Sequence, residues 1–388
     1  HEGTTEELDN YTEWVKKVVE EHRTIYGELP TFDYGRYTFL IGYNPWVDGD
    51  GMEHRNSTVC TSTGSLATNA YGLIGTVSHE FFHAWNIERI RPKSLEPFDF
   101  DHANLSEALW FGEGFTSYFD KLTLSRAGIL EPEQYVKRLI GGLNYVLNSP
   151  SREFRGPVED SYNATFVDAG TANDETNYSN NFVSYYSYGS VIGLGLDLTL
   201  RSEFNKTLDE YMRMVWQQYG KPEIPYTLPD LQKVLAQLTN KDFAERFFTD
   251  QIYGSKLPDF ESLFEEFGIK VSLQNPNSAY FGNPKLNEKQ EVQSTVMRGT
   301  ALYEAGLETG DKIVSINSQS INSTADLNKV INSLEIGKTY SISYVQMGIP
   351  KEGEFTTKQD PRITLSYISD DKLNKKIIKR RNDWLEIE

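Results

Sequence analysis

Apolar residues recur at intervals of three and four through most of residues 6–253, which is the spacing of an amphipathic helix. The first run, residues 6–26, stops at a Gly-Pro break. A second run begins at Tyr71 and stops at Arg91-Pro92, because proline cannot continue a helix. The pattern predicts a largely helical body, with further helices over residues 104–127, 131–147, 189–204, 207–219, 229–239 and 241–253.

Extended runs lie on either side of that body. Residues 36–43 and 52–63 are rich in aromatic and β-branched side chains and predict strands near the amino end. After Phe267-Gly268 short extended runs separated by Asn, Gly and Ser continue to about Tyr367. The fold class is therefore predicted to be α+β. We expect a mainly helical domain over residues 1–268, a small mixed β domain over 269–370 and a charged tail or helix over 371–388.

Length and charge narrow the classes of partner. A chain of 388 residues exceeds what one hydrophobic core usually serves, so two domains are expected. A net charge of -18 would repel a phosphate backbone, and nucleic acid is not expected as a partner.

No apolar run reaches the length of a membrane span. The single cysteine, Cys60, excludes an intrachain disulfide, and a start at His1 rather than Met predicts a missing upstream segment.

Residues 78–83 contain the motif H-E-x-x-H inside a predicted helix. This spacing places the imidazoles of His79 and His83 one turn apart on one face, where both can bind a single tetrahedral Zn²⁺. Glu80 can then act as the general base that deprotonates a zinc-activated water. The alternative is a buried helix with two incidental histidines. Burying two imidazoles and a carboxylate without a metal would be costly, which favours the zinc site.

A catalytic zinc usually takes a third protein ligand and leaves one position open. Two glutamates on the next predicted helix are candidates, Glu107 and Glu113. The histidines also need hydrogen bonds on their second ring nitrogens, which fix the tautomer. Asn86, Ser117 and Asp120 are the candidates for those bonds.

The segment Trp110–Phe115 (WFGEGF) resembles the gluzincin metallopeptidases, whose second helix carries W-x-x-E-G-F with the glutamate on zinc. The resemblance implies that Glu113 is the third ligand. His79–Pro92 is similar to the corresponding stretch of the glycyl aminopeptidase family, whose members join a thermolysin-like catalytic domain to a C-terminal PDZ domain. Relatives carry a β-rich domain before the catalytic one, and this domain is expected to be absent from the chain. The resemblance to this family implies one Zn²⁺ per chain and a preference for Gly or Ala as the N-terminal residue of the substrate. It also implies a location in the bacterial envelope or outside the cell.

The resemblance also assigns substrate contacts. Gly51, Met52 and Glu53 stand where the aminopeptidases place the edge strand that receives substrate. Glu53 is then expected to pair with the free α-ammonium of the peptide. Residues 185–189 (YYSYG) resemble the Y-x-K-G segment that carries a transition-state tyrosine. The register leaves two candidates, Tyr186 and Tyr185, and we expect the Tyr186 hydroxyl to stabilise the oxyanion.

Residues 297–317 resemble a PDZ domain of the permuted bacterial kind, with residues 325–334 as its groove-lining helix. The loop containing Tyr280, Phe281 and Gly282 is the expected receptor for a peptide carboxylate, so peptide C-termini are possible partners. The alternative is a packing domain that binds no peptide.

These features together predict a zinc aminopeptidase that removes N-terminal residues from peptides with a free N-terminus. A thermolysin-type endopeptidase is the main alternative, and Glu53 is the residue that separates the two. A less favoured alternative is an inactive PDZ scaffold. The complete set of ligands and the base in the sequence argues against that scaffold.

Overall fold

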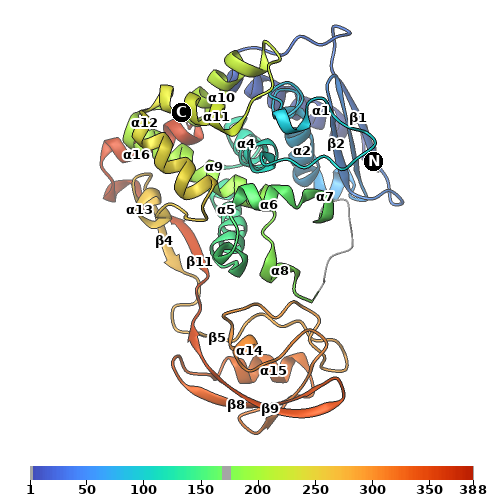
Figure 1. Ribbon diagram of the computed structural model, residues 1–388, viewed down its shortest axis with the longest axis vertical. Helices are drawn as coiled ribbons and strands as arrows, with labels where there is room; N and C mark the ends of the chain where they lie inside the picture. Colours follow the sequence, from blue (N-terminus) through green and yellow to red (C-terminus); the bar gives the residue numbers. More distant parts are fainter. Residues whose placement is uncertain (1–2, 168–175, 388) are drawn as a thin grey trace.

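A computed structural model describes residues 3–167 and 176–387. A large helical body and a small β-rich domain lie end to end along the long axis of the molecule (Figure 1). The mixture of helices and strands agrees with the expected class. None of the helices in these residues combines the length and apolar character needed to cross a bilayer.

A helix and a three-stranded sheet begin the large body. Helix α1 (Thr5–Tyr26) starts at a capping box formed by Thr4 and Glu7. In the sheet, β1 (Thr38–Tyr43) runs parallel to β3 (Ser57–Ser62), and β2 (Asp50–His54) pairs antiparallel with β3 at the edge. The extended piece expected over residues 52–63 is therefore two strands joined by a tight turn. The edge strand β2 contacts helix α2 (Leu66–Phe82).

Helix α2 ends at Phe82, although apolar spacing predicted that it would continue to Arg91. The buried guanidinium of Arg89 donates to the Ala84 carbonyl at 2.7 Å and to the carbonyls of Thr31 and Arg55 at 3.0 Å. The bond to Ala84 satisfies a carbonyl group that a longer helix would have used, and the other two bonds tie this turn of the chain to the segments of Thr31 and Arg55. The helix expected over residues 104–127 begins later and is broken at Glu113, giving α3 (Leu109–Gly112) and α4 (Gly114–Arg126).

Further helices complete the body around α4 and α9, which lie against each other at its centre. The apolar side chains of these helices form one continuous core. The helices are α5 (Pro132–Leu147), α6 (Pro157–Tyr162), α7 (Ala164–Val167), α8 (Tyr178–Asn181), α9 (Tyr185–Thr199), α10 (Leu208–Val215), α11 (Leu228–Leu238), α12 (Lys241–Phe247) and α13 (Phe260–Glu265), with π-helical turns after α9, α10 and α12.

The small domain has a separate core, formed by residues between Ala279 and Phe355. Its main sheet has the order β7-β6-β8-β9, and a short pair β10-β5 lies beside it. Two helices cover the sheet (Figure 1). The elements are β5 (Ala279–Tyr280), α14 (Ala301–Glu304), β6 (Lys312–Ile316), β7 (Gln319–Ser320), α15 (Thr324–Ile331), β8 (Thr339–Gln346), β9 (Ile349–Thr356) and β10 (Lys358–Gln359).

The chain enters and leaves the small domain through one antiparallel ribbon. Strand β4 (Ile269–Leu273) pairs with β11 (Ile363–Tyr367), and the Asn144 side chain of α5 holds the ribbon by two 2.8 Å bonds with the backbone of Ile363. After β11 the chain returns to the large body as α16 (Lys375–Leu385). The indole of Trp384 is fully buried there and donates to the Tyr118 hydroxyl at 3.0 Å.

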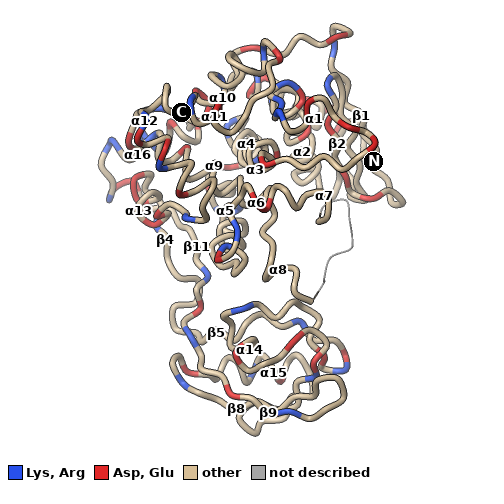
Figure 2. Tube along the Cα trace, in the orientation of Figure 1, with Lys and Arg blue, Asp and Glu red and all other residues tan. Residues whose placement is uncertain are grey.

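Charged residues of both signs are spread over both parts of the molecule (Figure 2). The segment 371–388, expected to be a charged tail or helix, contains α16, and the basic residues between 375 and 381 lie on this helix. Two of its arginines are buried against acidic partners: Arg380 pairs with Glu266, and Arg381 pairs with Asp370 at 2.6 Å. The small domain also touches the body at Asn180, whose side chain donates to Val296 O at 2.9 Å and accepts from Arg298 N at 2.8 Å.

Candidate active site

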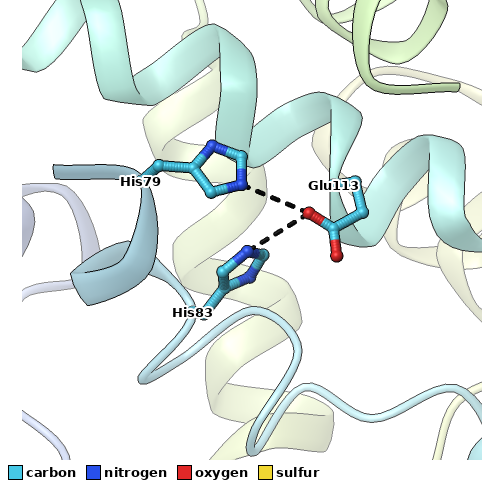
Figure 3. Close-up of side chains that lie close together, drawn as sticks. All are labelled: His79, His83 and Glu113. Atoms are coloured by element: carbon cyan, nitrogen blue, oxygen red, sulfur yellow. Dashed lines mark hydrogen bonds and ion pairs between the residues drawn. The ribbon is translucent and has the colours of Figure 1, made fainter. Parts of the chain in front are cut away.

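Three side chains from two separate segments point toward one another in the large body (Figure 3). One carboxylate oxygen of Glu113, Oε2, lies 3.2 Å from His79 Nε2 and 3.2 Å from His83 Nε2. Two ligands about 2.0 to 2.1 Å from a tetrahedral ion lie about 3.3 Å apart, so the three atoms fit one metal ion. Glu107 belongs to no such group among the described residues. Glu113 is therefore the glutamate that the fold brings to the histidines.

The second nitrogen of each imidazole has its own partner. His79 Nδ1 lies 3.0 Å from Asp120 Oδ2, and His83 Nδ1 lies 2.6 Å from the backbone oxygen of Asn86. Both Nε2 atoms are thereby left to face the common point, as metal ligation requires. Asn86 contributes through its carbonyl, because its side-chain amide donates to the carbonyls of Phe111 and Gly112. Ser117 lines the cleft and bonds neither histidine among the described contacts.

The electrostatics of the three residues are strongly coupled. Burial lowers the pKa of His83, but the carboxylates of Glu113, Glu53 and Glu80 together raise that pKa to about 10. Burial also lowers the pKa of His79, and hydrogen bonds with Asp120 and Glu113 raise it to about 8. Burial alone would raise the pKa of Glu113, but the two histidines hold it well below its usual range. The centre therefore holds concentrated opposite charges, and a cation could take the place of the imidazole protons.

Glu80 lies beside this centre. Burial raises the pKa of its carboxyl to about 7, which suits a group that accepts and returns a proton near neutral pH. Its Oε2 atom is buried and bonds no described residue. The backbone of β2 passes close by, since a Cβ on Gly51 would lie 2.1 Å from Glu80 Oε1. Gly51 thus makes room for the carboxylate, and the neighbouring Met52 side chain is exposed.

Glu53 reaches the same centre from the edge strand β2. Ligand atoms of Glu53, Glu80 and His83 lie within 4.8 Å of one another, so a carboxylate of β2 stands next to the histidine motif. This second group could also hold a metal ion. It contains one histidine and two carboxylates, and the His79, His83 and Glu113 group, with two imidazoles, suits zinc better.

The two candidate tyrosines occupy different environments. Tyr186 lines the cleft, with its ring centroid 5.9 Å from that of His79. Tyr185 is buried in the interior and packs near Phe182. The structure thus places Tyr186, and not Tyr185, beside the histidines. Its expected role with the oxyanion stays a prediction.

A contact between two glycines sets the distance from Glu113 to Tyr186. A Cβ on Gly114 would lie 2.3 Å from the Cα of Gly189, and a Cβ on Gly189 would lie 2.0 Å from the carbonyl oxygen of Trp110. Only glycine allows α4 and α9 to approach this closely. The glycines of W-x-x-E-G-F and of the tyrosine segment therefore allow Glu113 and Tyr186 to lie close to each other.

The cleft around these residues has a volume of about 630 Å³. Sequence reasoning missed two cations in its lining, Lys121 and Arg138. Lys121 lies at positions i+4 and i+8 from Ser117 and Glu113, so helical spacing on α4 could have identified it. Arg138 comes from α5, and no local pattern marks it. The cleft with the candidate metal site thus lies between β2, α2, α4, α5 and α9.

The small domain was expected to present a carboxylate-binding loop. Tyr280 and Gly282 border a cavity of about 230 Å³, and Gly282 has the positive φ of 109° that favours glycine. Phe281 is buried and packs on Phe355 in the domain core. The expected groove helix forms as α15, but no residue of α15 lines the cavity, whose other walls come from Ser179, Asn283, Pro284 and several residues between 292 and 302.

Two imidazoles and a carboxylate around one point, with a second buried carboxylate alongside, form the kind of centre that supports metal-assisted hydrolysis. Residues 72–192 match the model of the M61 glycyl aminopeptidase family, and residues 267–354 match that of the PDZ domain. The resemblance to glycyl aminopeptidases that carry a PDZ domain is thereby confirmed.

A solved structure of similar fold is the aminopeptidase N family protein from Idiomarina loihiensis. It matches with a TM-score of 0.81 and 26% identity over 97% of this chain. The chain spans 66% of that structure's length. Much weaker likenesses are an M1 zinc metallopeptidase from Deinococcus radiodurans (TM-score 0.42, 13% identity, 63% of this chain and 45% of that one) and a serine endoprotease from Yersinia pestis (TM-score 0.19, 16% identity, 22% and 30%). No curated protein matches the chain. The family match and the Idiomarina structure support a peptidase.

Proposed function

We propose that this protein is a zinc-dependent aminopeptidase that hydrolyses the N-terminal residue, with Gly or Ala preferred, from peptides. One observation carries the proposal. The Glu53 carboxylate on an edge strand stands within 4.8 Å of the ligand atoms of Glu80 and His83, where it can pair with a substrate ammonium. The M61 match over residues 72–192 supports the same reading. The position of β2 beside α2 supports a thermolysin-like fold of the gluzincin type for the catalytic domain.

His79, His83 and Glu113 would hold the zinc ion. A bound zinc supplies a Lewis acid that polarises the scissile carbonyl and makes water more acidic. The donor set supports this assignment, because two imidazoles and one carboxylate are common ligands of catalytic zinc. Asp120 and the Asn86 carbonyl orient the imidazoles from behind.

Glu80 would move the proton. As the water oxygen attacks the carbonyl carbon, Glu80 accepts a proton from that water. When the C–N bond breaks, Glu80 returns the proton to the departing amine. A carboxyl group with a pKa of about 7 can perform both transfers at neutral pH. The buried Oε2 atom, with no described partner, is suited to this role.

Tyr186 would donate a hydrogen bond to the oxyanion that forms in the transition state. Removing one such donor typically costs about 10² to 10³ in kcat, so Tyr186→Phe should lower kcat by that factor with little change in KM. Steady-state kinetics on an aminoacyl reporter measure both constants. Tyr185→Phe is the matched control and should keep kcat, because its ring lies in the interior. A kcat loss in Tyr185→Phe alone would move the role to Tyr185.

Glu53 would bind the α-ammonium and so restrict cleavage to the first peptide bond. A charge-assisted hydrogen bond contributes about 1.5 to 3 kcal/mol, so Glu53→Ala should lower kcat/KM on free-amine peptides by about tenfold to a hundredfold. N-acetylated versions of the same peptides should be poor substrates for wild type and no worse for the variant. If wild type instead cuts acetylated peptides at internal bonds as fast as free ones, the protein is a thermolysin-type endopeptidase.

The small domain would bind peptide C-termini at the loop of Tyr280, Phe281 and Gly282. The PDZ match over residues 267–354 and the cavity next to Gly282 support this assignment. Such binding could retain a protein near the cleft by β-augmentation or carboxylate capture.

A further inference from the structure

A second cavity, of about 260 Å³, adjoins the metal cleft. Both cavities are lined by Ser117, Lys121, Arg138 and Tyr186, so they share one wall. The second cavity extends between α4, α5 and α9, away from the edge strand β2. We name it the basic subsite.

The lining of the basic subsite has two chemical parts. Its charged side chains are both cations, Lys121 and Arg138, and no acidic residue lines it. Its remaining side chains are mainly aliphatic, with small serines between them: Leu139, Leu143, Val191, Leu194, Ser187 and Ser190. The subsite suits a ligand with an apolar side chain and a carboxylate.

The two cations differ in how they are held. Lys121 Nζ donates to Ser117 O and to Asp120 Oδ1, each at 3.1 Å, which fixes the ammonium at the rim. The other oxygen of Asp120 bonds His79, so Asp120 is already shared. Arg138 is exposed and makes no hydrogen bond or ion pair with a described residue. Its guanidinium is therefore available for a bidentate bond with a carboxylate.

Acidic residues lie at the β2 end of the cleft, and the charged residues of the basic subsite are both cations. Glu53 and Asp50 line the part next to β2 and are absent from the basic subsite. Tyr186 lies between the two parts and lines both. If the first residue of a peptide lies at Glu53 and its carbonyl lies at Tyr186, the residue after the scissile bond enters the basic subsite. This direction of the bound peptide along the cleft rests on the proposed aminopeptidase function.

We propose that the basic subsite binds the residue on the leaving side of the scissile bond. The aliphatic wall receives its side chain, and Arg138 with Lys121 binds a carboxylate on it. That carboxylate is either the C-terminus of a dipeptide or an acidic side chain. The aliphatic wall favours the first source, because an apolar side chain and a free C-terminus then occupy the subsite together. On this proposal the preferred substrates are dipeptides with an apolar second residue and a free C-terminus.

The experiment compares Gly-Leu with Gly-Leu-amide on wild type, on Arg138→Gln and on the control Lys137→Gln. Lys137 is the neighbour of Arg138 on α5, is exposed and lines neither cavity. We expect wild type to prefer the acid over the amide by about tenfold in kcat/KM, the size of an exposed charge-assisted bond. Arg138→Gln should lose the preference, Arg138→Lys should recover part of it, and Lys137→Gln should keep it. Salt at 1 M should weaken it.

A second pair of substrates, Gly-Glu-amide and Gly-Gln-amide, separates the two sources of carboxylate. A preference for Gly-Leu acid alone identifies the C-terminus, and a preference for Gly-Glu-amide alone identifies the acidic side chain. Equal rates within both pairs would overturn the inference. Calorimetric titration of the same peptides into Glu80→Gln measures binding without turnover. If binding prefers the acid while wild type cleaves none of the peptides, the subsite stands and the aminopeptidase function fails.

Discussion

Replacing Glu80 with Gln is expected to lower kcat by about 10² to 10⁴ while leaving zinc content and substrate affinity near those of wild type. The amide has the shape of the carboxylate and cannot accept a proton. Glu80 is not a member of the His79, His83 and Glu113 group, so the substitution should leave that group intact. Gly51 already leaves space for the side chain, and the substitution adds no non-hydrogen atoms. Turnover of a dipeptide and metal analysis of the purified protein measure the two effects.

Glu88→Gln is the matched control for that variant. Glu88 is partly buried, comes shortly after the motif and lines neither cavity next to the metal centre. The same chemical change there should alter kcat by less than about tenfold, because no proton transfer depends on it. Residual activity of Glu80→Gln within tenfold of wild type would remove Glu80 from the mechanism.

Replacing a proposed metal ligand should have an effect at least as large. Glu113→Ala removes one of three protein ligands, and we expect the protein to lose bound zinc on dialysis and to lose about 10³ or more in kcat. It also leaves His79 and His83 without the carboxylate that now lies 3.2 Å from both. Zinc stoichiometry after dialysis against a chelator, at a concentration that does not strip wild type, measures the loss.

Glu107→Ala is the control, because Glu107 was the other candidate from the sequence. It lies before α3 and belongs to no metal-binding group among the described residues. It should therefore retain one zinc per chain and most of its activity. Full zinc retention by Glu113→Ala would show that another residue supplies the third ligand.

The parts of the site that were predictable from the sequence follow from local geometry. The four-residue spacing of His79 and His83 fixes both on one face wherever a helix forms. Lys121 could have been found in the same way, from its place on the Glu113 face of α4. Glu113 itself needed a resemblance, since two glutamates on the same predicted helix satisfied the chemistry equally well.

The rest depends on contacts between distant segments. Apolar spacing continued past Phe82, but the helix stops there, and the Arg89 side chain bonds the carbonyls of Ala84, Thr31 and Arg55. Arg138 enters the cleft because α5 packs beside α9, and no spacing within α5 records that. Such long-range contacts are set by tertiary packing, which overrides local preference.

The ribbon of β4 and β11 makes the small domain an insert rather than an appendage. Its entry and exit lie side by side in one strand pair, with Leu273 opposite Ile363. The chain that follows still supplies Trp384 to the core of the large body. Cutting the chain after β9 would therefore remove the PDZ domain's last strands together with a helix that the peptidase body needs. A short turn that joins β4 directly to β11 would instead remove the small domain and keep α16 in place. Another recognition domain whose termini lie close together could be inserted at the same strand pair.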